Sequence, residues 1–391
     1  MRELLLMASM ALMVGIGGAA RVAAEETVGD DTSQRIASAS AVLAPAPALR
    51  QPRGPDARPF ELLGAAIPAA SFRQLSWAAT QQFEGVSVET PVLVAHGAEP
   101  GPVLCLTAAV HGDELNGIEV VRRVLHGVEP AALSGTVVGV PIVNIQAFQR
   151  RSRYLPDRRD LNRHFPGSAG GSAASRIAHS LFSNVVVHCD ALVDLHTGSF
   201  DRINLPQLRA DLSDPGVAAL ARGFGATVVV NSQPRSGTLR SAATRAGIPA
   251  VTLEAGGPDQ LELEKIAHGV RGIEALLQTL GMVADAQPWN AREATYVGSS
   301  WVRADRGGIL MSDVELGSEV EQGDLLGRLI DPVTNKSTAI RAPGRGRVIG
   351  MARNQILMPG FAAYHLGSEG RIENDGLPPP IPDDDASDTS E

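Results

Sequence analysis

Continuous apolar runs of strand length alternate with segments of helical period between residues 100 and 256. In the segment 115–125, for example, Leu115, Ile118, Val121 and Val124 recur at helical spacing. The predicted strands cover residues 103–109, 136–143, 189–195, 227–231 and 248–253. Strands that are apolar throughout are typical of a sheet that helices cover on both faces. The pattern therefore predicts an α/β fold with a mixed, mainly parallel sheet between layers of helices.

The pattern changes after about residue 290. Residues 295–367 hold short β-rich pieces separated by glycines, without a helical period. We predict a large α/β domain at 59–290, followed by a small all-β, barrel-like domain at 291–370. Residues 25–58 are rich in Ala, Pro and Ser and are interpreted as a flexible linker. The acidic residues 371–391 are interpreted as a disordered tail.

The N-terminus has the features of an export signal. Arg2 precedes an apolar run over residues 4–20, and small residues at 22–24 offer a cleavage site before Glu25. We interpret residues 1–24 as a signal peptide, so the mature protein is expected to be periplasmic or secreted, with no stable membrane insertion. The apolar run is just long enough to span a bilayer, so an uncleaved anchor is the alternative.

Composition and charge limit the classes of partner. The chain has 391 residues, 44% of them hydrophobic and 20% charged, which is the balance of a soluble globular protein. The formal net charge is −9, but six of these charges lie in the last 21 residues. The remainder is close to neutral, so nucleic-acid binding has no electrostatic support.

The chain has two cysteines, Cys105 and Cys189, each in an apolar, strand-like run. Two buried free thiols are the favoured interpretation. A disulfide stays open for an exported protein, because sequence alone does not place the two Cα atoms within bridging distance.

A histidine and two further donors stand where predicted strands end. His111 and Glu114 lie three residues apart, directly after the 103–109 strand, and His196 ends the 189–195 run. Open α/β sheets place their sites at the carboxyl ends of such strands. Two imidazoles and one carboxylate leave a coordination position for water, as catalytic zinc requires. We predict one zinc ion per chain at these residues; the alternative for the first pair is an exposed helix start, where the dipole favours Glu114.

A polar loop follows a dense group of arginines, several of which we expect to form a solvated face. In this loop Asn162 and Arg163 suit a substrate carboxylate, because a guanidinium binds one through two hydrogen bonds. Asp160 can accept a hydrogen bond from a ligand histidine and so fix its tautomer.

Glu254 ends the apolar 248–253 run and enters two glycines. Taken alone it is as readily a surface carboxylate as a functional one. Beside a metal site, however, Glu254 can take a proton from zinc-bound water, which makes it the candidate catalytic base.

The segment 199–209 directly follows the third candidate ligand. Its polar side chains make it a candidate lining of the substrate pocket, with Arg202 and Asn204, together with Arg209, as the binding residues. The alternative is a loop that is merely solvated.

Four motifs occur in the order typical of the succinylglutamate desuccinylase/aspartoacylase family of the zinc carboxypeptidase superfamily. They are His-Gly-Asp-Glu-x-Asn-Gly at 111–117, Asp-Leu-Asn-Arg-x-Phe-Pro-Gly at 160–167, Asp-Leu-His-Thr-Gly at 194–198 and Leu-Glu-Ala-Gly-Gly at 253–257. The chain resembles this family over about residues 60–370. The resemblance implies a zinc carboxypeptidase-like fold, zinc ligands at His111, Glu114 and His196, and a catalytic glutamate at Glu254.

The resemblance also implies roles for the arginine-rich loop. Asn162 and Arg163 look like the pair that holds the substrate carboxylate, and Asp160 looks like the support of the first ligand histidine. Arg153 resembles the arginine that polarises the scissile carbonyl. Arg151 is a rival for that last role.

The C-terminal β segment resembles a lipoyl- or biotinyl-type barrel, with 317–332 and 341–366 as its two halves. Such domains carry a modifiable lysine on a hairpin tip. The chain's lysines are Lys265 and Lys336, and Lys336 lacks the expected flanking residues. A lid or oligomerisation role is therefore favoured over a carrier role, and the oligomeric state stays open.

These features predict a zinc-dependent hydrolase that cleaves the amide bond, or an ester bond, of an N-acyl amino acid or related substrate with a carboxylate. The first alternative is an exported metallocarboxypeptidase or amidase that acts on peptides or cell-wall peptide. The second is a non-catalytic protein that binds zinc or a ligand. An intact Glu254 beside intact ligands argues against the second alternative, because a binding protein needs no base.

Overall fold

The computed structural model describes residues 58–83, 86–284, 289, 293–353, 356–369 and 381–382. The predicted signal peptide, nearly all of the predicted linker and most of the acidic tail lie outside these residues. None of the described helices combines the length and the apolar character that a membrane crossing requires.

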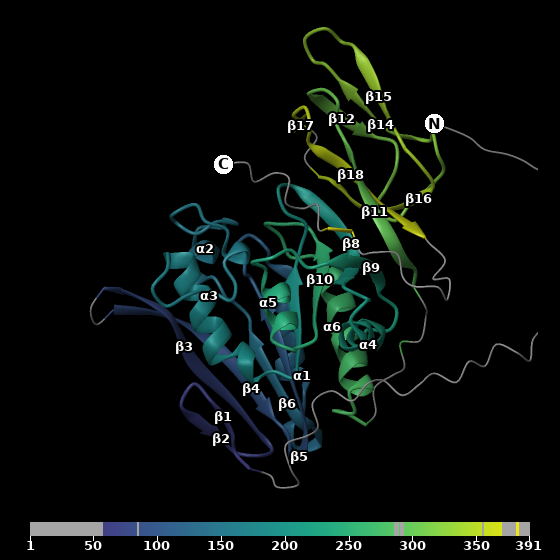
Figure 1. Cartoon of the computed structure of the whole chain (residues 1–391). Coiled ribbons are helices and arrows are strands. Elements are labelled where there is room, and N and C mark those ends of the chain that lie inside the picture. Colours follow the sequence, from purple (N-terminus) through teal and green to yellow (C-terminus); the bar gives the residue numbers. More distant parts are fainter. Residues whose placement is uncertain are drawn as a thin grey trace, which may run out of the picture. The chain divides into compact units, whose positions relative to one another are not determined.

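A long mixed sheet runs through the structure (Figure 1). Its strands before residue 260 are β3 (Ser71–Phe83), β4 (Val86–His96), β5 (Glu99–Ala108), β6 (Ser134–Val140), β7 (Ala191–His196), β8 (Arg202–Ala210), β9 (Val228–Gln233) and β10 (Ala250–Gly256). They are arranged in the order β9-β8-β10-β7-β5-β6-β4-β3. A hairpin of β1 (Phe60–Leu62) and β2 (Ala65–Ile67) precedes them, and β19 (Ile381–Pro382) pairs with β9.

The prediction of a mainly parallel sheet is not confirmed. The central strands β6, β5, β7 and β10 are parallel neighbours. In contrast, β3 pairs antiparallel with β4, β4 with β6 and β8 with β10, whereas β8 and β9 are again parallel. The physical reason is connection length. Parallel strands require a crossover of a dozen or more residues, whereas two residues join β4 to β5 and five join β7 to β8. Such short connections reverse the direction of the chain.

Two layers of helices pack on the sheet. The helices are α1 (Asn116–Gly127), α2 (Ile145–Gln149), α3 (Ala173–Asn184), α4 (Pro215–Gly223), α5 (Leu239–Arg245) and α6 (Leu263–Thr279), with short turns η1 (Pro130–Ala132), η2 (Leu161–Arg163) and η3 (Val186–His188). Alternate residues of β5 enter different cores, since Cys105 packs with α3 and α5 whereas Leu104 and Leu106 pack with α1, α4 and α6. Successive strand residues point to opposite faces, so helices cover both faces of the sheet.

The described residues after 293 contain strands and no helix. The strands are β11 (Thr295–Arg303), β12 (Gly308–Ser312), β13 (Glu319–Val320), β14 (Leu325–Ile330), β15 (Ser337–Arg341), β16 (Gly346–Ala352), β17 (Ile356–Leu357) and β18 (Ala362–Glu369). They share a core of their own. Four of them form a small sheet, but β11 pairs with β9 and β16 pairs with β8, which joins the segment to the main sheet. A separate barrel-like domain therefore stays a prediction.

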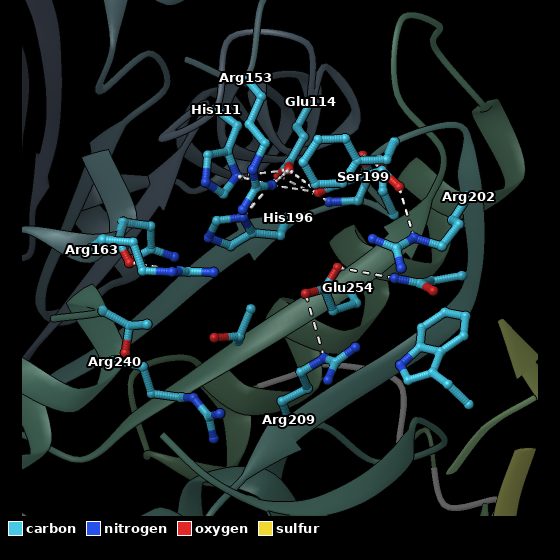
Figure 2. A pocket seen from close by; sticks show the side chains of 18 residues that line it. His111, Glu114, Arg153, Arg163, His196, Ser199, Arg202, Arg209, Arg240 and Glu254 are labelled. Carbon is cyan, nitrogen blue, oxygen red and sulfur yellow. Dashed lines mark hydrogen bonds and ion pairs between the residues drawn. The ribbon is translucent and has the colours of Figure 1, made fainter. Parts of the chain in front are cut away.

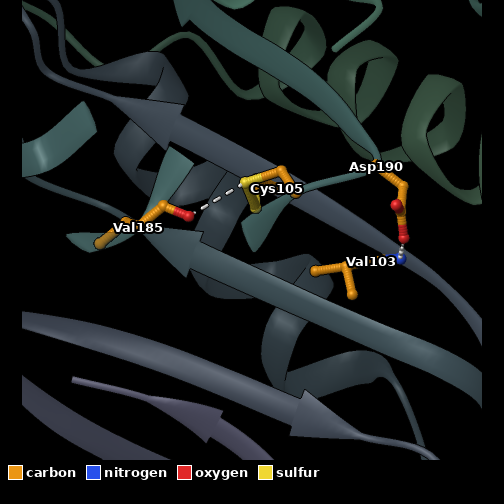
Figure 3. Close-up of a disulfide and its surroundings, with 5 residues drawn as sticks. Val103, Cys105, Val185 and Asp190 are labelled. Atoms are coloured by element: carbon orange, nitrogen blue, oxygen red, sulfur yellow. Dashed lines mark hydrogen bonds between the residues drawn. A yellow bond between two sulfur atoms is a disulfide. The ribbon is translucent and has the colours of Figure 1, made fainter. Parts of the chain in front are cut away.

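The two cysteines form a disulfide, so the favoured interpretation as free thiols is wrong (Figure 3). Cys105 lies on β5 and Cys189 lies two residues before β7, the parallel neighbour of β5. Their Cα atoms are 5.8 Å apart. Val103 and Asp190 tie the same two segments together, because each backbone N–H donates a hydrogen bond to the other residue. The cysteines are 84 positions apart in sequence, and only the pairing of the strands brings them within reach.

Removing this disulfide is expected to destabilise the fold. The Cys105→Ala/Cys189→Ala double variant should lose about 2–4 kcal/mol of unfolding free energy, because the open chain gains conformational entropy when it unfolds. Alanine suits the buried position, since it adds no unpaired hydroxyl. Urea unfolding of the oxidised wild type and the variant measures the difference, and identical midpoints would show that the bond does not stabilise the protein.

Candidate active site

Three buried side chains from two neighbouring strands converge on one point (Figure 2). His111 and Glu114 lie in the turn after β5, and His196 is the last residue of β7, which pairs with β5 in parallel. The Nδ1 atoms of His111 and His196 lie 2.7 and 2.8 Å from the two carboxylate oxygens of Glu114. One donor atom from each residue lies within 4.8 Å of the others. The three residues together form a cluster that can hold a metal ion.

The turn that carries the first two donors requires a glycine. A Cβ atom at Gly112 would clash with the backbone carbonyl carbon of Ala147. The backbone N–H of Gly112 also donates a hydrogen bond to the carbonyl of Ser152, at 3.0 Å. A larger residue would push this turn away from α2 and displace His111.

Each histidine contacts an aspartate through Nε2, the ring nitrogen that does not face Glu114. Nε2 of His111 lies 3.1 Å from Oδ1 of Asp160, and Nε2 of His196 lies 2.8 Å from Oδ2 of Asp194. An imidazole that donates its Nε2–H to a carboxylate keeps a lone pair on Nδ1, which here faces Glu114. Sequence reasoning missed Asp194. The sequence feature that could have indicated Asp194 is its position two residues before His196, which places both side chains on one face of the strand.

Electrostatics favour positive charge at the centre of the cluster. Burial alone would raise the pKa of Glu114, but the adjacent His111 and His196 hold it well below its usual range. Burial alone would lower the pKa of His196, but Asp194 and Glu114 raise it well above its ordinary value. Two imidazole nitrogens and one carboxylate are a donor set that suits zinc and leaves a coordination position open.

Arg153 lies beside the cluster, whereas its rival Arg151 is exposed. The guanidinium of Arg153 donates to Asp160 at 2.9 Å and to the hydroxyl of Ser199 at 2.5 Å, and lies 3.5 Å from Glu114. These contacts fix a buried positive charge at the edge of the candidate metal site.

Glu254 lies on the other neighbour of β7. Strand β10 pairs with β7 in parallel, and Glu254 is the register partner of His196. Nδ2 of Asn204 donates a hydrogen bond to Glu254 at 3.1 Å, and Nε of Arg209 lies 3.5 Å from the same carboxylate. The carboxylate is thus buried and oriented next to the donor cluster.

Asn162 and Arg163 line the same pocket, and α5 adds an arginine that the sequence did not indicate. Oδ1 of Asn162 accepts a hydrogen bond from the backbone N–H of Leu239, the first residue of α5. Arg240 is the next residue; it is buried, and its guanidinium donates to the backbone and hydroxyl oxygens of Ser232. The sequence feature that could have indicated Arg240 is a charged residue among the small and apolar residues of a short helix.

The 199–209 segment lines the opposite side of the pocket, together with an aromatic residue of the C-terminal segment. The guanidinium of Arg202 lies 5.0 Å from the ring centre of Trp301, which belongs to β11. Trp301 is stacked on His365 at 4.3 Å. No local pattern in the sequence indicated Trp301, because its position depends on how β11 pairs with β9.

The pocket thus brings together the predicted residues except Asp160, which lies behind His111. Figure 2 shows Arg163 and Arg240 on one side of Glu254 and Arg202 on the other. The lining residues are His111, Glu114, Arg153, Asn162, Arg163, His196, Thr197, Gly198, Ser199, Phe200, Arg202, Asn204, Arg209, Thr238, Arg240, Thr252, Glu254 and Trp301.

Comparison with known proteins identifies the family. The sequence profile of the succinylglutamate desuccinylase/aspartoacylase catalytic domain matches residues 100–280. N-alpha-acetyl-L-2,4-diaminobutyric acid deacetylase of Halomonas elongata is 30% identical over 257 residues, which cover 63% of this chain and 75% of that protein. The chain belongs to the succinylglutamate desuccinylase/aspartoacylase family. It is therefore a hydrolytic enzyme, which removes the non-catalytic alternative.

Solved structures with family names share the fold. A succinylglutamate desuccinylase from Silicibacter sp. TM1040 is 25% identical, with a TM-score of 0.68 over 78% of this chain and 97% of that chain. A succinylglutamate desuccinylase/aspartoacylase from Rhodobacter sphaeroides is 27% identical, with a TM-score of 0.67 over 76% of this chain and 95% of that chain. The match to the family's catalytic domain contains every predicted site residue, whereas Trp301 lies beyond it.

Proposed function

We propose that this family member is a zinc-dependent deacylase that hydrolyses the amide bond of an N-acyl amino acid, with Glu254 as its base. The observation that carries the proposal is the register of β10 against β7, which sets Glu254 beside His196. A buried carboxylate thereby adjoins a cluster of three metal donors.

The donor cluster supports zinc as the metal. His111, Glu114 and His196 would hold the ion through two nitrogens and one carboxylate, and Asp160 and Asp194 would orient the histidines. When bound, zinc supplies a Lewis acid that polarises a carbonyl and makes water more acidic.

Glu254 has the position of a general base. Its carboxylate takes a proton from the attacking water and then delivers it to the leaving nitrogen of the amide. The hydrogen bond from Asn204 and the contact with Arg209 keep the carboxylate directed into the pocket. The guanidinium of Arg153, fixed by Asp160 and Ser199, stabilises the negative charge that develops on the carbonyl oxygen.

A carboxylate on the substrate binds on the α5 side of the pocket. Arg163 and Arg240 present two guanidinium groups there, and Asn162 fixes the start of α5. Guanidinium groups bind carboxylates with defined geometry, so this side holds the amino-acid half of the substrate. Arg202 lines the side where the acyl half lies.

We also propose that the protein is exported. The disulfide supports this location, because such bonds persist in oxidising compartments and are rare in the cytosol. The signal-like sequence at residues 1–24 is the second support.

A chelator experiment tests the metal and the reaction together. Dipicolinate is expected to abolish amide hydrolysis, because the open coordination site loses its ion, and added zinc should restore the activity. The substrates are N-acetyl and N-succinyl derivatives of aspartate, glutamate, diaminobutyrate and alanine, with matching esters, dipeptides and a cell-wall peptide. Incubation with zinc-saturated chelator is the control.

The pattern of cleavage separates the alternatives. Hydrolysis of the acylated amino acids supports the proposal, and cleavage of peptides alone would favour the carboxypeptidase or amidase alternative. Activity that survives complete removal of the metal would contradict the zinc mechanism.

A further inference from the structure

The C-terminal β segment pairs with β8, the strand whose Asn204 donates a hydrogen bond to the proposed base. Strand β16 pairs antiparallel with β8, and Gly350 is the register partner of Asn204. Farther along β8, Nε2 of Gln207 donates a hydrogen bond to the carbonyl of Ile349 at 3.1 Å. The backbone of β16 therefore fixes the strand from which Asn204 reaches Glu254.

The amide of Asn204 lies between Glu254 and Gly350. Nδ2 donates to Oε2 of Glu254 at 3.1 Å, which directs the amide oxygen the other way. A Cβ atom at residue 350 would lie 2.7 Å from that oxygen and 3.2 Å from Cβ of His365. The first distance is shorter than real Cβ contacts allow, so any side chain at this position must displace the amide.

The amide has little room to adapt. Asn204 is 3% exposed, and its Oδ1 is buried without a hydrogen-bond partner among the described residues. Turning the amide over would set Oδ1 against the Glu254 carboxylate, which repels an acceptor. The absence of a side chain at Gly350 is thus a condition for the hydrogen bond that Asn204 donates to Glu254.

We propose that Gly350 is a positioning residue for catalysis, which acts through Asn204 on Glu254. The C-terminal segment is then part of the active site, although it lies beyond the matched catalytic domain. This inference rests on the proposed role of Glu254 as base. It assigns Asn204 to orientation of that base rather than to direct substrate binding.

The test compares Gly350→Ala with a matched substitution in the same segment. A Cβ atom at Gly344 meets no atom within 4 Å, so Gly344→Ala is the control. Full-length, zinc-loaded protein is assayed with the acylated amino acid that the wild type cleaves best. Gly350→Ala is expected to lower kcat by about 10- to 100-fold, the usual effect of a hydrogen bond to a charged group, with KM and zinc content unchanged. Gly344→Ala should match the wild type.

A double-mutant cycle separates positioning from a general loss of structure. Asn204→Ala alone should lower kcat by a similar factor, and adding Gly350→Ala to it should cause no further loss, because the contact is already absent. Thermal unfolding of each variant reports stability separately.

Unchanged kcat in Gly350→Ala, or multiplicative losses in the double variant, would overturn the inference. Failure of the wild type to cleave any acylated amino acid would overturn the proposed function as well. The two failures are therefore distinguishable.

Discussion

Replacing Glu254 with glutamine is expected to lower kcat by about 10²–10⁴-fold, the usual contribution of a general base. Glutamine has the shape of glutamate but does not accept the proton of the attacking water. Glu254 is not one of the three donors of the metal cluster, so zinc content should stay that of the wild type. Steady-state kinetics and metal analysis of the same preparation measure both quantities.

Glu264→Gln is the matched control, because Glu264 is exposed on the first turn of α6. It removes one carboxylate outside the pocket and should leave kcat unchanged. Full activity of Glu254→Gln with zinc still bound would assign the base elsewhere.

Replacing His196 with alanine should remove both zinc and activity. The substitution deletes the nitrogen that lies 2.8 Å from Glu114, and the two remaining donors hold zinc weakly. Asp194→Asn should have a smaller effect, a loss of about 10- to 100-fold in zinc affinity, because it weakens only the support of the ligand.

His126→Ala is the control for these variants, since His126 is exposed in the last turn of α1. Its zinc content should equal that of the wild type. A His196→Ala protein that keeps one zinc per chain and hydrolyses substrate would show that the metal binds elsewhere.

Local sequence patterns anticipated the part of the fold that short-range physics determines. The apolar runs at 103–109 and 189–195 correspond to β5 and β7, and the polar residues that end them meet because the two strands are parallel neighbours. A donor at a strand end is therefore visible in sequence. The direction of the outer strands was not predicted from the apolar pattern, because it depends on connection lengths such as the five residues between β7 and β8.

The residues that the sequence did not indicate depend on long-range packing. Arg240 enters the pocket because Asn162 holds the start of α5, and Trp301 enters because β11 pairs with β9 of the main sheet. The disulfide of Cys105 and Cys189 likewise requires β5 and β7 to be neighbours. None of these distances follows from periodicity along the chain, which reports only the local element.

Anomalous diffraction at the zinc absorption edge, from crystals of the zinc-reconstituted protein, tests the central claim most directly. The account predicts one strong peak among the Nδ1 atoms of His111 and His196 and the carboxylate of Glu114. A peak at another place, or none at these residues after reconstitution, would contradict the zinc site and the mechanism built on it.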